Sequence, residues 1–166
     1  MTTSPQNQPS LKFLFQHPAH FFALGFGSGL AKKAPGTFGT LVAFPLYFFI
    51  PNNIALGLPV LVFLFLFGCY VCEKTGKDLG VPDHGAIVWD EIVAMLLLLY
   101  FMPFPSWQTW LIAFLLFRLF DIWKPYPISY FDAKFKNGFG VMLDDILAAA
   151  YAVNVFAGIL WLSKHL

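Results

Sequence analysis

Two pairs of acidic residues stand at the start of two apolar segments. The stretches WDEIVA and LDDILA share one pattern, and their acid pairs are Asp90 with Glu91 and Asp144 with Asp145. Residues three and four positions apart share a helix face, so each pair stands over an alanine at which a neighbouring helix can approach closely. Acids at the edge of hydrocarbon are costly and rarely kept without a role. The pattern predicts that both pairs face a helix interface, although acids that only complement the helix dipole would give the same spacing.

A third charged cluster ends the apolar segment between the two acid pairs. Arg118, Asp121 and Lys124 recur every three residues and therefore share one helix face. Carboxylates that converge at one depth repel one another unless a cation lies among them, and oxygen ligands favour Mg²⁺ or Mn²⁺ over zinc. Cations beside such a site suit a phosphate substrate. The simpler explanation is a local Arg–Asp pair together with cations that favour a helix C-terminus.

Two shorter motifs could also contribute to phosphate chemistry. The sequence PGTFG precedes an apolar segment, and backbone N–H groups at Gly36 and Thr37 could hold phosphate oxygens, although Thr37 is equally suited to cap a helix. Asp83 and His84 precede the segment with the first acid pair. His84 could protonate a leaving alkoxide, with Asp83 as a further catalytic candidate, but a solvated loop histidine is an equal alternative.

The composition places these residues in a membrane protein. Of the 166 residues 58% are hydrophobic and 11% charged, and the mean hydropathy is +0.69. A membrane-spanning helix needs about 20 apolar residues. Four stretches meet or approach that length and a fifth is shorter; they are 54–72, 87–102, 107–122, 141–162 and 38–50. We expect an all-α polytopic bundle of four to five transmembrane helices.

The N-terminal part of the chain has a different character. Residues 20–30 form a short apolar run broken by glycines, which predicts an interfacial or re-entrant segment. Residues 1–19 are expected to be a polar tail, and residues 20–166 to form a single membrane-embedded domain.

Charged residues gather on one side of this predicted topology. If the spans alternate, nine of the ten Lys and Arg residues and all nine acids fall on one side, and Lys164 falls on the other. The positive-inside rule places the charged side in the cytoplasm. A net charge of +1 argues against nucleic acid as a partner, and the two cysteines cannot build a four-ligand zinc site.

Several blocks together resemble the phosphatidylglycerophosphatase A family of bacterial membrane phosphatases. They read GSGL, PGTFG, DHGAIVWDE, FRLFDIWKPYP and GFGVMLDD, and the resemblance runs from about residue 25 to residue 150. It implies Mg²⁺-dependent removal of the terminal phosphate from phosphatidylglycerophosphate. The products would be phosphatidylglycerol and phosphate, released in the bacterial inner membrane at a site that faces the cytoplasm.

The resemblance and the convergence of charges suggest roles for individual residues. Asp90, Glu91, Asp144 and Asp145 are expected to bind Mg²⁺, and Asp121 to be a further ligand or to orient the attacking water; Lys124 and Arg118 would hold the phosphate. Direct attack by water is favoured, with a phospho-aspartyl intermediate left open.

Three other functional classes compete with this interpretation. A small cation or proton-coupled transporter also uses acids in the membrane, but the runs 94–102 and 148–153 carry no charge. A lipid head-group transferase would need acid, glycine and arginine clusters that are missing here. A scaffold without chemistry would leave the acid pairs unexplained.

Overall fold

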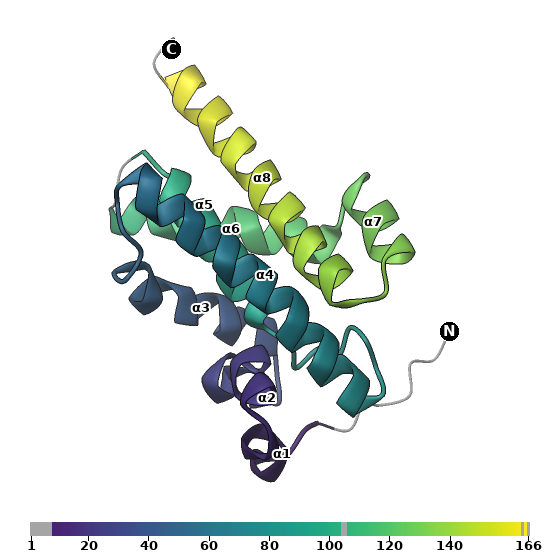
Figure 1. Cartoon of the computed structure of the whole chain (residues 1–166). Coiled ribbons are helices and arrows are strands. Elements are labelled where there is room, and N and C mark those ends of the chain that lie inside the picture. Colours follow the sequence, from purple (N-terminus) through teal and green to yellow (C-terminus); the bar gives the residue numbers. More distant parts are fainter. Residues whose placement is uncertain (1–7, 104–105, 164, 166) are drawn as a thin grey trace.

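The chain is all-helical over the residues that the structure, a computed structural model, describes: 8–103, 106–163 and 165 (Figure 1). The elements in order are α1 (Leu11–Gln16), α2 (Pro18–Ala23), the 3-10 helix η1 (Gly25–Leu30), α3 (Pro35–Tyr47), α4 (Ile54–Leu79), α5 (Trp89–Phe101), α6 (Trp107–Trp123), α7 (Ile128–Lys134) and α8 (Gly138–Ser163). The predicted all-α fold class is confirmed. Lys164 and part of the turn at 103–106 lie outside the described residues.

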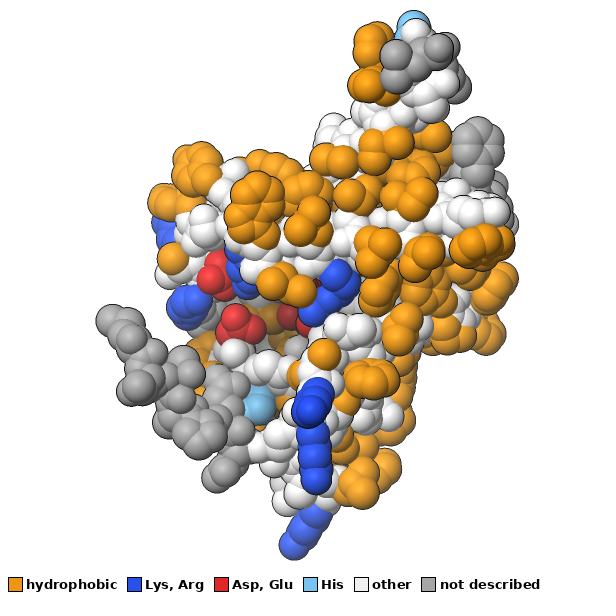
Figure 2. Space-filling view, turned by 180° about the vertical axis from the view of Figure 1, so that it is seen from behind, with side chains coloured by type: hydrophobic (Ala, Val, Ile, Leu, Met, Phe, Trp, Pro, Cys, Tyr) orange, Lys and Arg blue, Asp and Glu red, His pale blue; other side chains and the backbone are white. Residues whose placement is uncertain are grey.

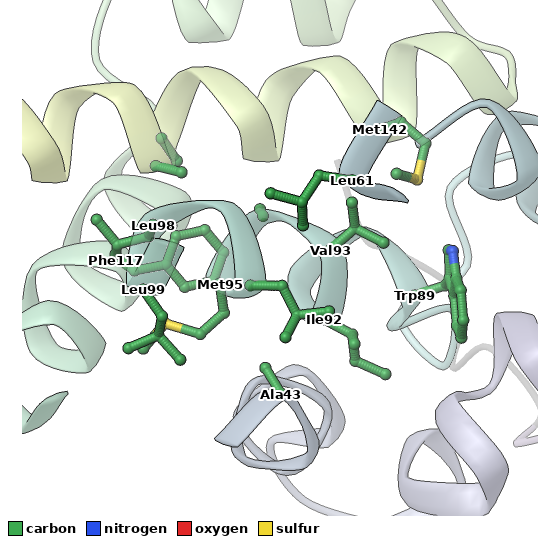
Figure 3. Close-up of a cluster of buried hydrophobic side chains, with 14 of the residues drawn as sticks. Ala43, Leu61, Trp89, Ile92, Val93, Met95, Leu98, Leu99, Phe117 and Met142 are labelled. Atoms are coloured by element: carbon green, nitrogen blue, oxygen red, sulfur yellow. The ribbon is translucent and has the colours of Figure 1, made fainter. Parts of the chain in front are cut away.

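Helix α5 forms the centre of the bundle. After its acid pair its sequence is apolar on every face, a pattern typical of a helix surrounded by others. It packs against α3, α4, α6 and α8. Figure 3 shows Ile92, Met95 and Leu99 along α5, with Ala43 of α3 below them and Phe117 of α6 beside Leu99, and all five side chains are buried. The first turn of α5, with its two acids, is therefore held in place from several sides.

The longer helices alternate in direction, so that their charged ends meet. At that end the first residue of α8, Gly138, packs directly against the backbone of α4. A Cβ on Gly138 would lie only 2.1 Å from the carbonyl oxygen of Cys69. At the opposite end the rings of Tyr47 in α3 and Trp110 in α6 are 5.8 Å apart. The starts of α3, α5 and α8 therefore share one end of the bundle with the ends of α4 and α6.

Two helices have the length and composition to cross a membrane. Helices α4 and α8 have 26 residues each, and only 22% of the apolar window of each is buried. At 1.5 Å per residue each extends about 39 Å, more than the roughly 30 Å of bilayer hydrocarbon. Helices α3, α5 and α6 have 13, 13 and 17 residues and are shorter than an ordinary span. Two of the predicted four to five spans therefore meet the length requirement.

Several helix boundaries differ from the sequence-based expectation. Helix α4 runs to Leu79 rather than residue 72, because Glu73 with Lys77 and Lys74 with Asp78 form ion pairs one helical turn apart. Glu73 and Asp78 are thus part of the helix.

Part of the expected polar tail is also folded. Helix α1 lies within residues 1–19, and Leu14, only 2% exposed, packs with Leu24 and Ala86. The glycine-broken run 20–30 continues from α2 into η1, where Phe26 and Gly27 have φ values of 59° and 101°. Four of the five residues in the sequence LKFLF are apolar and form most of this helix, although the residues around them are polar.

Candidate active site

Three carboxylates converge where α5 meets α8, two of them buried (Asp90, Asp145) and the third, Glu91, with a side chain that is 13% exposed. One carboxylate oxygen each from Asp90, Glu91 and Asp145 lies within 4.8 Å of the other two. One oxygen of each group, Asp90 Oδ1, Glu91 Oε2 and Asp145 Oδ2, is buried and has no hydrogen-bond partner among the described residues. Buried like charges without donors are strongly unfavourable. This arrangement fits a divalent cation, and three of the four predicted metal ligands are brought together.

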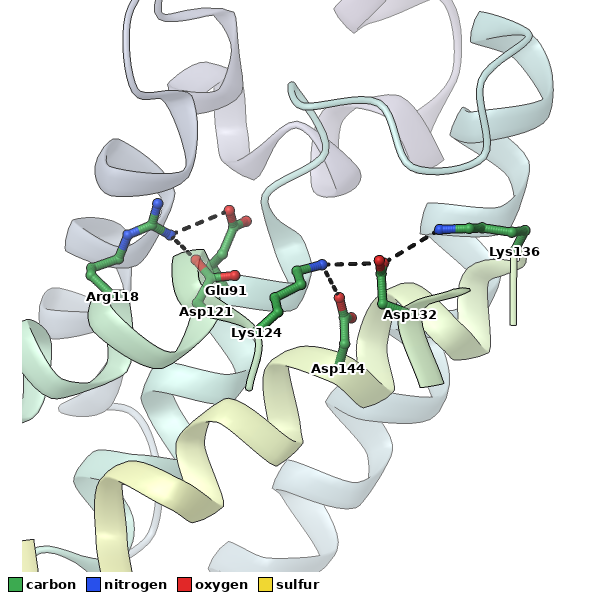
Figure 4. Close-up of polar contacts among 7 residues, drawn as sticks. All are labelled: Glu91, Arg118, Asp121, Lys124, Asp132, Lys136 and Asp144. Carbon is green, nitrogen blue, oxygen red and sulfur yellow. Dashed lines mark hydrogen bonds and ion pairs between the residues drawn. The ribbon is translucent and has the colours of Figure 1, made fainter. Parts of the chain in front are cut away.

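Asp144, the fourth predicted ligand, turns toward a different neighbour. One of its carboxylate oxygens accepts a hydrogen bond from Lys124 Nζ, and the same ammonium group lies 3.2 Å from Asp132 (Figure 4). The other oxygen of Asp144, Oδ1, is buried without a partner in the described part of the chain. Asp144 therefore neutralises Lys124 and keeps one oxygen available.

Arg118 lies between two of the site's acids. Its Nη1 is 2.6 Å from Asp121 and 3.6 Å from Glu91 (Figure 4). Asp121 in turn is close enough to Asp145 for its charge to act on that carboxylate. Arg118 and Lys124 were predicted to bind phosphate. In this structure both form ion pairs with carboxylates of the protein.

Gly36 completes the wall of the site from α3. A Cβ on this residue would lie 2.2 Å from Glu91 Oε1 and 3.0 Å from Arg118 Nη1, so α3 can approach only because the side chain is absent. Gly36 thus lies at the predicted site. Thr37 follows it in the first turn of α3 and is half-buried.

Lys124 remains a cation in this setting. Burial lowers its pKa, but the charges of Asp144, Asp132 and Asp83 raise it, and the result is a pKa above the ordinary value for lysine. Asp83 is therefore close enough to act on Lys124. The predicted candidate Asp83 is exposed in its loop and belongs to the surroundings of the site.

His84 is a buried residue, so the alternative of a solvated loop histidine is wrong. It is 5% exposed, and its Nδ1 accepts a hydrogen bond of 3.1 Å from the backbone N–H of Ala86. This contact organises the turn that leads into α5. A neutral ring with Nδ1 as acceptor carries its proton on Nε2.

Asp132 is the contact that sequence reasoning missed. It lies in α7 and contacts both Lys124 and Lys136, at 3.2 and 3.5 Å. The two prolines at 125 and 127 signalled a reversal of the chain after α6, and such a reversal returns the next residues toward Lys124.

The site opens on one face of the molecule. Figure 2 shows acidic side chains inside a hollow with basic side chains at its rim and apolar side chains over the surrounding helices. An anionic group on an apolar body fits these surroundings. The fold and the site together define a helical-bundle enzyme with a carboxylate centre at one end of the bundle.

Comparison with known proteins identifies the family. The chain matches phosphatidylglycerophosphatase A over residues 21–160, and it belongs to this family of phosphatases. It is 50% identical to "Phosphatidylglycerophosphatase A" of Haemophilus influenzae over 152 residues, 90% of this chain and 93% of that protein. It is 40% identical to the protein of the same name from Escherichia coli over 170 residues, 99% of this chain and 95% of that protein.

A third relative carries another name. A protein of Bacteroides thetaiotaomicron, provisionally named a phosphatidylinositol-3-phosphatase, is 39% identical over 145 residues, which cover 82% of this chain and 90% of that protein. No solved structure matches the chain. The predicted family and enzyme class are confirmed.

Proposed function

We propose that this phosphatase hydrolyses the terminal phosphomonoester of phosphatidylglycerophosphate and releases phosphatidylglycerol and phosphate, with Mg²⁺ as its cofactor. The names of the Haemophilus and Escherichia relatives support the substrate. The observation that carries the cofactor is the convergence of three carboxylates, each with a buried oxygen that lacks a hydrogen-bond partner within the described residues. Oxygen-only ligation suits Mg²⁺, with Mn²⁺ as a substitute.

Asp90, Glu91 and Asp145 would hold the ion, and the free Oδ1 of Asp144 would add a fourth protein ligand. When bound, Mg²⁺ neutralises charge on the phosphate and polarises its oxygens. Arg118 keeps Glu91 and Asp121 in position through its two ion pairs.

Asp121 is the residue that would orient the attacking water. It lies beside Asp145 and its carboxylate is fixed by Arg118. The water oxygen forms a bond to phosphorus, the bond from phosphorus to the glycerol oxygen breaks, and the one proton that the water gives up balances the one that the leaving alkoxide takes up. Lys124 would attract the phosphate from the side away from the three carboxylates. His84 is buried by the turn before α5, and its ring is the candidate proton donor.

Direct attack by water differs from a phospho-aspartyl route in a measurable way. We expect no phosphoenzyme when the reaction with lipid labelled in its terminal phosphate is quenched in acid during steady turnover. Recovery of label on Asp121 or on another carboxylate would contradict direct attack.

The proposed location is the bacterial inner membrane with the site on the cytoplasmic side. Helices α4 and α8 are long and apolar enough to cross a membrane, which supports the membrane location. The positive-inside rule supports the cytoplasmic orientation of the site. Reaction of a K77C variant with an impermeant maleimide tests on which side of the membrane the charged end of α4 lies. Inverted membrane vesicles should label and intact spheroplasts should not, because Lys77 lies near the charged end of α4.

The activity itself is tested with purified protein in detergent. Phosphate release from phosphatidylglycerophosphate should occur, stop with EDTA and return when Mg²⁺ is added in excess. Release that is absent, or that continues in EDTA, would overturn the proposal.

A further inference from the structure

A buried histidine outside the active site joins three helices. His20 of α2 is only 3% exposed, and its ring stacks on the ring of Phe13 in α1 with 4.0 Å between the centroids. Its Nδ1 lies 3.1 Å from the carbonyl oxygen of Phe13, and its Nε2 lies 2.7 Å from a carboxylate oxygen of Asp78 in α4. His20 therefore ties α1 and α2 to the charged end of α4.

Both neighbours of the His20 ring are hydrogen-bond acceptors. A carbonyl oxygen can only accept, and the oxygen of Asp78 that faces His20 is also paired with the ammonium group of Lys74, as expected for a carboxylate. Imidazolium is the form of histidine with two N–H donors, so this pair of acceptors fits a protonated ring. Hydrogen bonds between charged groups are stronger than neutral ones. The proposed reaction uses neither His20 nor Asp78.

Helix α2 packs against α4 and also holds the start of α5 (Figure 1). The carbonyl oxygen of Ala23, the last residue of α2, accepts a hydrogen bond of 2.9 Å from the backbone N–H of Val88. Val88 is the N-cap residue of α5, and Asp90 comes two residues later. The end of α2 is therefore bonded directly to the turn that presents the acid pair of α5.

Aromatic rings from α2 and η1 pack against the first residue of α5. The ring of Trp89 lies 5.6 Å from Phe22 of α2 and 6.0 Å from Phe26 of η1, with the ring planes close to perpendicular. Trp89 is 4% exposed and directly precedes Asp90 and Glu91. A shift of α2 would therefore move two of the three converging carboxylates.

We propose that His20 is a positioning residue for the carboxylate centre and acts through α2 and Val88. This inference rests on the proposed function. The bridge from His20 to Asp78 fixes α2 against α4, and the carbonyl oxygen of Ala23 then fixes the N-cap of α5. Together they set the place of the two acids of α5 relative to the carboxylate of α8. His20 contacts neither the substrate nor the metal ligands.

Substitution of Asp78 tests the bridge at its outer end, where the side chain is 32% exposed and its removal should leave the protein folded. D78A should lower kcat for phosphate release by about tenfold with KM unchanged, and weaken the binding of Mn²⁺ by about the same factor. D78E keeps the carboxylate and should restore most of the activity. The matched control is K74A, which removes the other partner of Asp78 and should behave as wild type.

A double-mutant cycle with H20Q separates one bridge from two independent contacts. If His20 and Asp78 act together, the H20Q/D78A protein should lose no more kcat than D78A alone, whereas independent effects would multiply to about a hundredfold.

Hydrogen exchange gives a readout that does not depend on activity. In D78A the amide of Val88 should exchange faster than in the wild type, because its bond to Ala23 opens more often, while amides in the middle of α8 keep their wild-type rates.

D78A protein with wild-type kcat and wild-type exchange at Val88 overturns the proposal. A loss of kcat that K74A shares, a multiplied loss in H20Q/D78A, or faster exchange throughout α8 also overturns it, because the effect would then be general destabilisation or would not come from the bridge. Wild-type protein that binds no Mn²⁺ and releases no phosphate would instead overturn the proposed function, and this inference with it.

Discussion

Substitution of Gly36 by alanine tests how closely α3 must approach the site. A Cβ at this position would lie 2.2 Å from Glu91 Oε1, whereas ordinary contact begins at 3.4 Å, so Glu91 or α3 must move by about 1.2 Å. A shift of about 1 Å in a positioned group can cost on the order of 100-fold in rate. Since helix propensity by itself favours alanine, the G36A protein should fold and lose about 100-fold in kcat.

The assay is phosphate release in detergent, with helical content and thermal unfolding measured on the same samples. G158A is the matched control, because a Cβ at Gly158 meets nothing within 4 Å. It should retain full activity. A G36A protein that is as active as G158A would refute the close approach of α3 to Glu91. A G36A protein that is inactive because it has unfolded would refute the argument that the clash is confined to the site.

Four further substitutions test other contacts. D90N and D145N should each reduce phosphate release by about 1000-fold or more while the helical content is unchanged, because each removes a charged oxygen from the carboxylate cluster that is proposed to bind Mg²⁺; retained activity in either would remove that residue from the site. G138A should lower the free energy of unfolding by about 1 to 3 kcal/mol, because its Cβ would lie 2.1 Å from the Cys69 carbonyl oxygen, and unchanged denaturant unfolding would contradict the α4–α8 contact. K124M should destabilise the fold by leaving Asp144 unpaired. Since the pKa of Lys124 is raised on folding, the stabilisation it provides is fully present below about pH 10.4 and is lost only as the pH rises above that value. The stability difference between wild type and K124M should therefore stay constant from neutral pH to about pH 10, and a decline within that range would contradict the raised pKa.

The sequence was sufficient to predict that helix ends bring acids together, but not how each helix is rotated. Asp144 and Asp145 are neighbours in the chain, and adjacent residues on a helix point about 100° apart. Asp145 faces the carboxylates of α5, whereas Asp144 faces Lys124. Only the packing of α8 against α5, α6 and α7 decides which acid faces which neighbour.

The lengths of the spans were also hard to predict, and for a related reason. The hydropathy of α5 predicts a membrane span, but this helix has 13 residues and is buried by its neighbours rather than by lipid. Hydropathy does not distinguish a protein interior from hydrocarbon. Helices α4 and α8 were predicted correctly as long apolar helices, because their exposed apolar residues continue over more than five turns.

The most direct test of the account is a metal titration of chelator-treated protein, with bound Mn²⁺ measured by electron paramagnetic resonance and phosphate release measured in the same samples. In the wild type we predict that metal binding and activity rise together, with Mg²⁺ competing for the same site. In D145N both should be lost at concentrations that saturate the wild type. Activity that appears without bound metal, or metal binding that D145N leaves unchanged, would contradict the claim that the three converging carboxylates form the catalytic centre.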